Sequence, residues 1–119
     1  MHTLWKSLLL AACLTVCTPA VYADVLQAKG KLTMLRVHDV GSGYGPQSDF
    51  IDVEVVIRLD TAPDKAFGFT LRNDANALAH EGMLSILRSA FEQNWTVIID
   101  YSVTPPKKNG VILRAVVTR

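Results

Sequence analysis

The residues best suited to bind a ligand lie in loops. Tyr44 stands among three glycines in the segment Gly41–Pro46, where it has little local reason to be buried. Aromatic rings stack on flat ligand rings, as measured for the bases of nucleic acids, and a sugar ring offers a similar face. Tyr44 is therefore predicted to be an exposed stacking platform. The alternative is a ring packed on the rim of the fold.

Two adjacent lysines, Lys107 and Lys108, lie in a second loop, Pro105–Gly110. Their ammonium groups are suited to the carboxylate of an acidic sugar. The alternative is a solvated hairpin turn, because Asn109-Gly110 is a favoured tight-turn pair and charges beside a turn are ordinary.

Polar side chains also alternate along the segments with a strand pattern. Opposite charges on neighbouring strands usually form cross-strand pairs, and we favour this interpretation. The alternative is a polar ligand-binding face that includes Arg58 and Arg72. The whole outward set is Arg36, His38, Asp52, Glu54, Arg58, Thr70 and Arg72.

The sequence lacks the residue sets that catalysis and metal binding require. A covalent nucleophile needs a neighbouring base, and acid–base catalysis needs carboxyl groups with separated pKa values. No G-x-S-x-G or H-E-x-x-H motif occurs, and the last cysteine is Cys17. His38 and His80 have no His or Cys at metal-ligand spacing. We therefore predict a non-enzymatic protein with no metal and no cofactor.

Five segments have the pattern of β-strands and must position these side chains. Three alternate with a period of two, and two are rich in β-branched residues. They follow a short lead-in at residues 24–30, and a turn is expected at residues 61–64. The predicted strands are Lys31–Val40, Phe50–Asp60, Phe67–Arg72, Thr96–Val103 and Val111–Thr118. The expected core face of the second is Ile51, Val53, Val55, Ile57 and Leu59.

The segment Ala75–Asn94 is predicted to be a helix, because its apolar residues recur with a period near 3.6. Asn73-Asp74 offers the N-cap and Asn94 the stop. The apolar arc is wider than one packing face needs. Packing on the sheet is expected for Leu84, Leu87 and Phe91. Contact with another subunit is expected for His80, Met83 or Ile86.

Three strands, one helix and two strands form the order of the five-stranded OB-fold barrel, which binds ligands on one face and two loops. We therefore predict a mostly β protein with one helix, a single OB-fold domain over residues 24–119. Its binding face is expected between the loops Gly41–Asp49 and Thr104–Gly110.

The segment Met1–Ala23 has the pattern of a secretory signal peptide. An apolar run follows Lys6, and the ending Val21-Tyr22-Ala23 suits cleavage before Asp24. The alternative is a lipoprotein signal cleaved at Cys13. Either way the protein is expected to be exported, to the periplasm or beyond, and the mature chain has no cysteine for a disulfide.

The charges of the predicted mature chain cancel. The sequence has 12 Lys and Arg, one of them Lys6 in the signal segment, against 11 Asp and Glu. A nucleic-acid binder normally has a basic excess, because neutralising phosphates supplies much of its affinity. Neutrality argues against nucleic acid and an anionic membrane surface as partners. It suits a neutral or singly charged ligand such as a sugar.

A cleaved signal, a mature chain of 119 − 23 = 96 residues and this element order resemble the B subunits of AB5-type bacterial toxins. The layout is similar to that of the subtilase cytotoxin and pertussis-like B subunits. The resemblance is one of architecture over Lys31–Arg119, and its nearest shared pattern is the helix Ala75–Asn94 running into Trp95–Tyr101. It implies a pentameric ring that binds cell-surface glycans and delivers an enzymatic A subunit. The chain departs from the family in lacking the usual disulfide, and no sugar-contacting residue is carried over.

We expect an exported, ring-forming homo-oligomer that binds a glycan and does not insert into a membrane. The alternative is a monomeric periplasmic OB-fold protein that binds a protein or small ligand and has a structural or stress role. A third alternative is an exported single-stranded nucleic-acid binder, whose affinity would depend strongly on salt.

Overall fold

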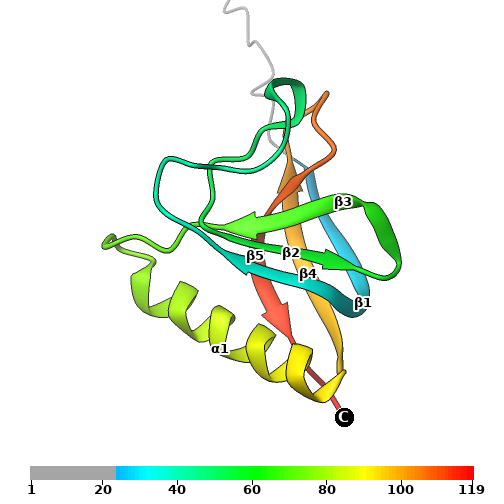
Figure 1. The fold of residues 1–119 in the computed structure, drawn as a ribbon. Helices are drawn as coiled ribbons and strands as arrows, with labels where there is room; N and C mark the ends of the chain where they lie inside the picture. Colours follow the sequence, from blue (N-terminus) through cyan, green and yellow to red (C-terminus); the bar gives the residue numbers. More distant parts are fainter. Residues whose placement is uncertain (1–23) are drawn as a thin grey trace, which may run out of the picture.

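A computed structural model describes residues 24–119, and the predicted signal peptide Met1–Ala23 lies outside the described residues. Five strands close into a barrel and one α-helix lies against it (Figure 1). The mostly β class and the predicted order of strands and helix are thereby confirmed, and the barrel is OB-like. The elements are β1 (Asp24–Val37), η1 (Gln47–Asp49), β2 (Val55–Leu59), β3 (Ala62–Phe69), α1 (Ala77–Gln93), β4 (Thr96–Val103) and β5 (Gly110–Val116).

The long strand β1 closes the barrel because it pairs with two different partners. Its first half runs antiparallel to β4, from the pair Asp24–Val103 to Lys31–Thr96. Its second half runs antiparallel to β2. Gly30 lies near the end of the first half, where a Cβ atom would stand 2.6 Å from a carboxylate oxygen of Asp60. The close approach of these two segments therefore requires glycine.

The expectation that residues 24–30 form an irregular lead-in is wrong. This segment is strand, although Val25 and Leu26 are both exposed and its residues do not alternate cleanly. Its strand conformation comes from the backbone ladder with β4. A ladder between residues about 70 positions apart leaves no local signal in the sequence.

The expected core face of the second strand is also partly wrong. Val55, Ile57 and Leu59 do enter the main core. By contrast, Ile51 and Val53 join a second apolar cluster. The regular strand begins only at Val55, so the alternation of inward and outward side chains does not continue from Val53 into the strand. The other buried members of this second cluster are Val56 and Ala66, with Met34 and Tyr44 packed against them.

The other strand bounds also differ from the prediction, most of all in the third strand. Strand β3 runs from Ala62 to Phe69, so the predicted strand Phe67–Arg72 is wrong at both ends, and the turn expected at residues 61–64 lies at Asp60-Thr61. Strand β1 ends at Val37 and not at the predicted Val40. Strand β4 has the predicted bounds, and β5 ends at Val116, before the predicted Thr118.

The helix begins later than predicted and ends where predicted. Its N-cap is Asn76, which makes no side-chain capping bond. Asp74 instead accepts a hydrogen bond from the Asn76 N–H at 2.9 Å, in the turn before the helix. Asn94 ends the helix in the left-handed conformation, with φ 56°, a conformation that asparagine adopts more readily than most residues.

Helix α1 packs on β1, β4 and β5 through one narrow face. Leu87 is completely buried in the main core, together with Met83 and Ala90, and Leu84 packs at its edge. Phe91 keeps 47 % of its surface exposed, so its expected place in the core is wrong. No helix in the described part of the chain is long and apolar enough to cross a membrane.

Leu87→Ala is expected to lower the free energy of unfolding by about 2–5 kcal/mol, because it leaves a cavity between the helix and the barrel. Leu78→Ala is the matched control, since Leu78 lies on the same helix and is 84 % exposed. The control should change stability by no more than about 0.5 kcal/mol. Urea denaturation followed by circular dichroism measures both, and equal effects would contradict the packing described here.

Candidate functional site

The loop between β1 and β2 is held against the outside of the barrel. Tyr44 and Ile51 exchange two backbone hydrogen bonds, each 2.9 Å long. Gly43 has φ +59°, and a Cβ atom there would stand 2.0 Å from the ring of Phe50. The glycines that surround Tyr44 therefore let the loop pack tightly. The predicted exposure of Tyr44 at a loop tip is wrong, because the side chain is half-buried.

Two arginines surround the tyrosine ring. Arg58 Nη2 donates a hydrogen bond to Tyr44 Oη at 2.7 Å. The guanidinium carbons of Arg36 and Arg58 lie 5.6 Å and 5.9 Å from the ring centre, a cation–π distance. We call these three residues the Tyr44 cluster. It joins two residues that the sequence analysis assigned to different candidate sites, the loop and a strand face.

The charges of the Tyr44 cluster are not neutralised locally. Within residues 24–119, neither Arg36 nor Arg58 forms an ion pair, and Arg58 Nε is buried without a hydrogen-bond partner. Arg36 is exposed to solvent. The cluster thus presents unpaired positive charge fixed in place by an aromatic ring, which suits an anionic group. Sequence reasoning placed Arg36 in the outward polar set but did not single it out as a ligand contact, because the pairing of β1 with β2 that brings it near Arg58 is visible only in the structure.

The two loops expected to flank a binding face are bonded to each other. Asp49 accepts hydrogen bonds from the backbone N–H groups of Lys108 and Asn109, at 2.7 Å and 2.8 Å. Lys107 Nζ donates to the carbonyl oxygen of Phe50 at 2.7 Å. Lys107 therefore helps to hold the loop, while the side chain of Lys108 is exposed.

Asn109 clamps the two loops and was missed by the sequence analysis. Its side-chain nitrogen donates to the Asp49 carbonyl oxygen, and its side-chain oxygen accepts from the Ala66 N–H, both at 2.9 Å. It is a buried loop clamp, and Gly110 after it already belongs to β5. From the sequence, Asn109-Gly110 predicted only a tight turn, with no role for the Asn109 side chain.

Arg72 is bound within the fold and lies outside the Tyr44 cluster. Its guanidinium donates to both carboxylate oxygens of Glu54, at 2.7 Å and 2.8 Å, and to Asp52 at 2.8 Å. The Leu71 N–H also donates to Glu54 at 3.0 Å. The charge pairing favoured in the sequence analysis therefore applies to Arg72. Its ligand-binding role stays a prediction, with its guanidinium already engaged.

Glu54 is buried, with 2 % of its side chain exposed, and was expected on an outward face. The Arg72 guanidinium, aided by the Leu71 N–H, holds the pKa of Glu54 below its ordinary value although burial opposes this. The hydrogen bonds to Glu54 and Asp52 raise the pKa of Arg72. The pair thus stays ionised and ties the segment after β3 to the segment before β2.

The three residues expected at a subunit contact have different surroundings. Met83 belongs to the core of its own chain, so the expectation that it meets another subunit is wrong. His80 is half-buried; its Nδ1 bonds the Thr70 carbonyl oxygen, and its ring packs edge-on to Phe69 at 5.3 Å. Ile86 keeps 36 % of its surface exposed, and its role in a contact stays a prediction.

The described residues contain no group of three His, Cys, Asp or Glu side chains placed to hold a metal ion. His38 Nε2 lies 2.6 Å from the carbonyl oxygen of Val53, which fixes its ring against the loop. What the arrangement offers chemically is recognition of charge by the Tyr44 cluster.

Comparison with protein-family models, curated proteins and solved structures finds no match to this chain, so its function is argued from its own geometry.

The free energy of unfolding is expected to fall as the pH drops below about 4.3, the ordinary pKa of glutamate. The folded-state pKa of Glu54 lies below its unfolded value, so the unfolded chain takes up the proton first. The stabilisation is therefore complete above the unfolded pKa and is lost as the pH falls through the folded one. Glu54→Gln should remove this part of the acid dependence, as measured by urea denaturation between pH 2 and 7.

Asp64→Asn provides the control for this measurement, because Asp64 is exposed and its side chain forms no hydrogen bond or ion pair within residues 24–119. Its acid dependence should match that of the unmodified protein. If Glu54→Gln lost stability on acidification as steeply as the unmodified protein, the ionised pair would not be a determinant of the fold.

Proposed function

We propose that this chain is an exported, non-enzymatic binding protein that recognises an acidic glycan through the Tyr44 cluster. The observation that carries the proposal is the pair of unneutralised guanidinium groups, Arg36 and Arg58, around one tyrosine ring. A guanidinium group donates two parallel hydrogen bonds to a carboxylate, which gives geometric specificity as well as affinity.

The geometry favours recognition of a charged group over stacking of a sugar on Tyr44. Both arginines already lie over the ring, and the phenol oxygen is bound to Arg58. The ring therefore positions the cations, and Arg36 is the side chain most open to a ligand. The balanced net charge of the chain fits a ligand with isolated acidic groups better than a polyanion.

A shallow site on the outside of a barrel binds one carboxylate weakly. Joining several copies of such a site raises the overall affinity without any new contact. This argument supports a homo-oligomer, and the resemblance to AB5-type toxin B subunits suggests a ring of five with an enzymatic A subunit as partner. The helix carries exposed apolar side chains for such a contact, among them Leu78, Ile86 and Phe91.

Arg36→Gln is expected to weaken binding to carboxylate-bearing glycans about tenfold or more, because it removes a charge-assisted hydrogen bond. A glycan array followed by titration calorimetry of the best ligand measures the effect. Tyr44→Phe keeps the packing but removes the acceptor for Arg58, so it should weaken binding less. Arg88→Gln is the matched control, since Arg88 is an exposed arginine on α1. An array without acidic hits, or unchanged binding by Arg36→Gln, would refute the proposed site.

The protein is expected to form an assembly larger than one chain. Ile86→Asp should shift this assembly towards smaller species, because the substitution places a charge in the proposed contact between subunits. Size-exclusion chromatography with light scattering measures the mass across a range of concentrations. Ser85→Asp tests whether any charge on this helix has the same effect. A single-chain mass at every concentration would contradict the oligomer.

A second function, binding of a partner protein by a single chain, is favoured by the edge of β5. Strand β3 pairs with β5 only at Gly110 and Val111, so the rest of that edge has no β3 partner. Leu113 on this stretch is 54 % exposed. An extended peptide adds to such an edge by backbone hydrogen bonds. A monomeric mass in the light-scattering experiment would favour this alternative.

A further inference from the structure

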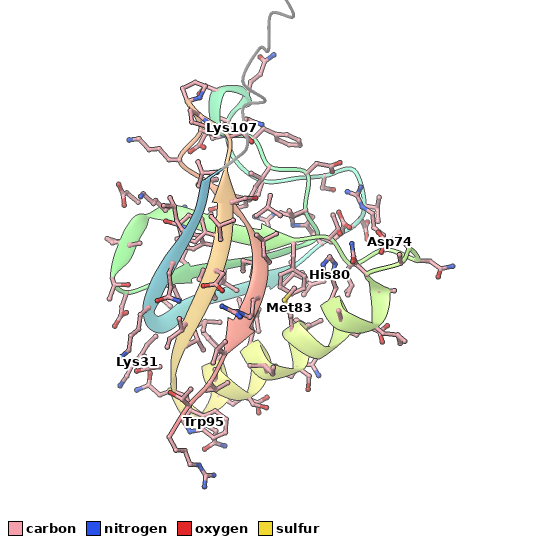
Figure 2. The ribbon with its side chains drawn as sticks, turned by 180° about the vertical axis from the view of Figure 1, so that it is seen from behind. Lys31, Asp74, His80, Met83, Trp95 and Lys107 are labelled. Atoms are coloured by element: carbon pink, nitrogen blue, oxygen red, sulfur yellow. The ribbon has the colours of Figure 1, made fainter. Side chains whose placement is uncertain are left out.

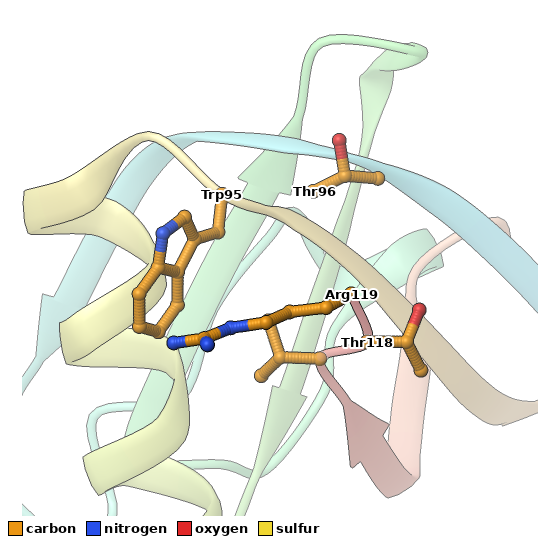
Figure 3. Close-up of a pocket in the computed structure, with 5 residues that line it drawn as sticks. Trp95, Thr96, Thr118 and Arg119 are labelled. Carbon is orange, nitrogen blue, oxygen red and sulfur yellow. The ribbon is translucent and has the colours of Figure 1, made fainter.

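A separate pocket lies where the helix ends and β4 begins. It has a volume of about 390 Å³, within the range of small-ligand sites. Figure 3 shows the indole of Trp95 on one side and the guanidinium end of Arg119 reaching towards it. The complete lining is Trp95, Thr96, Val117, Thr118 and Arg119.

The end of the helix fixes Trp95 in this position. Asn94 turns the chain in the left-handed conformation, and the Trp95 N–H then donates to the Ala90 carbonyl oxygen at 2.9 Å. The backbone of Trp95 is therefore held, while its side chain stays outside the core with 43 % exposed. An aromatic side chain of this size, half in solvent, offers a flat apolar wall to a ligand.

The polar groups of the pocket are not used by the rest of the described chain. Within residues 24–119, Arg119 forms no ion pair, and the side chains of Trp95, Thr96 and Thr118 form no hydrogen bond. Lys31 pairs with Thr96 across β1 and β4, so its side chain extends from the same face of the sheet. The pocket thus combines a flat apolar wall with positive charge, while Figure 3 shows the hydroxyl groups of Thr96 and Thr118 pointing away from the indole.

We propose that this pocket binds a monosaccharide ring that carries one carboxylate, the chemistry of a hexuronic acid. The ring would lie on the indole of Trp95, and the carboxylate would accept hydrogen bonds from the guanidinium of Arg119. A single guanidinium with its planar donors matches a single carboxylate. The small volume limits the ligand to a size near one sugar ring.

This site is distinct from the Tyr44 cluster and shares no residue with it. Figure 2 shows Trp95 at one end of the barrel and Lys107, which contacts the loop carrying Tyr44, at the other. Each site can therefore be removed without touching the other. If glucuronate did not bind at Trp95, the proposed role of the Tyr44 cluster would be unaffected. If Arg36→Gln did not weaken glycan binding, the proposal for the Trp95 pocket would be unaffected.

The test is an NMR titration of the full ¹⁵N-labelled chain with glucuronate. Trp5 lies in the segment expected to be cleaved on export, and Trp95→Phe assigns the Trp95 indole N–H signal whether or not Trp5 is present. Glucuronate should shift the Trp95 signal in a saturable way. Glucose, which has the same ring without the carboxylate, should bind about tenfold more weakly or worse. Arg119→Gln should weaken glucuronate binding to the same degree.

Arg114→Gln is the matched control, because Arg114 is also an exposed arginine near the end of the chain but is paired with Asp100. It removes the same charge and should leave the titration unchanged. The Arg36→Gln protein should also titrate like the unmodified one at Trp95. The proposal is overturned if glucuronate leaves the Trp95 signal unmoved, if glucose binds equally well, or if Arg114→Gln matches the loss caused by Arg119→Gln. Binding of benzoate without binding of glucuronate would overturn the sugar assignment.

Discussion

The structure depends on one strand that pairs with two partners. Because β1 bonds β4 with its first half and β2 with its second, it closes the sheet into a barrel. Closure removes most of the free strand edges that an open sheet of this size would expose. The bend between the halves needs the close approach at Gly30, where a side chain would collide with Asp60. Helix α1 then covers apolar residues that the barrel alone would leave in contact with water.

A second set of contacts holds the long segment between β1 and β2, and these contacts are polar. The pair of Glu54 with Arg72 secures one end of it, and Asp49 with Asn109 secures the middle. Buried polar groups are costly unless every partner is present, so these contacts define one position for the segment. That position places Tyr44 between two strand arginines.

The charge distribution separates structural from available groups. Among the described arginines, Arg72 and Arg114 are paired with carboxylates, and the pair of Arg72 with buried Glu54 ties two segments of the fold together. Arg36 and Arg119 are exposed and form no such pair within residues 24–119. A near-neutral net charge therefore conceals two local sites of positive charge. In our proposals, each lies beside an aromatic residue: Tyr44 positions the arginines around it, and Trp95 would stack on the ligand.

The sequence alone determined the order of the elements and part of the packing face of the helix, since Leu87 is in the core as expected but Phe91 is exposed and Met83 is buried. Periodicity is a local property, so it predicted the strands, the stop at Asn94 and the burial of Leu87. It also led to Tyr44 and Arg58, but as members of separate sites. Only the tertiary structure decided that residues 24–30 form a strand, that Ile51 and Val53 leave the main core, and that Glu54 is buried. These outcomes depend on pairing between distant segments, which no local pattern encodes. The pocket at Trp95 has the same origin, because its walls come from two segments about 20 residues apart that only the barrel brings together.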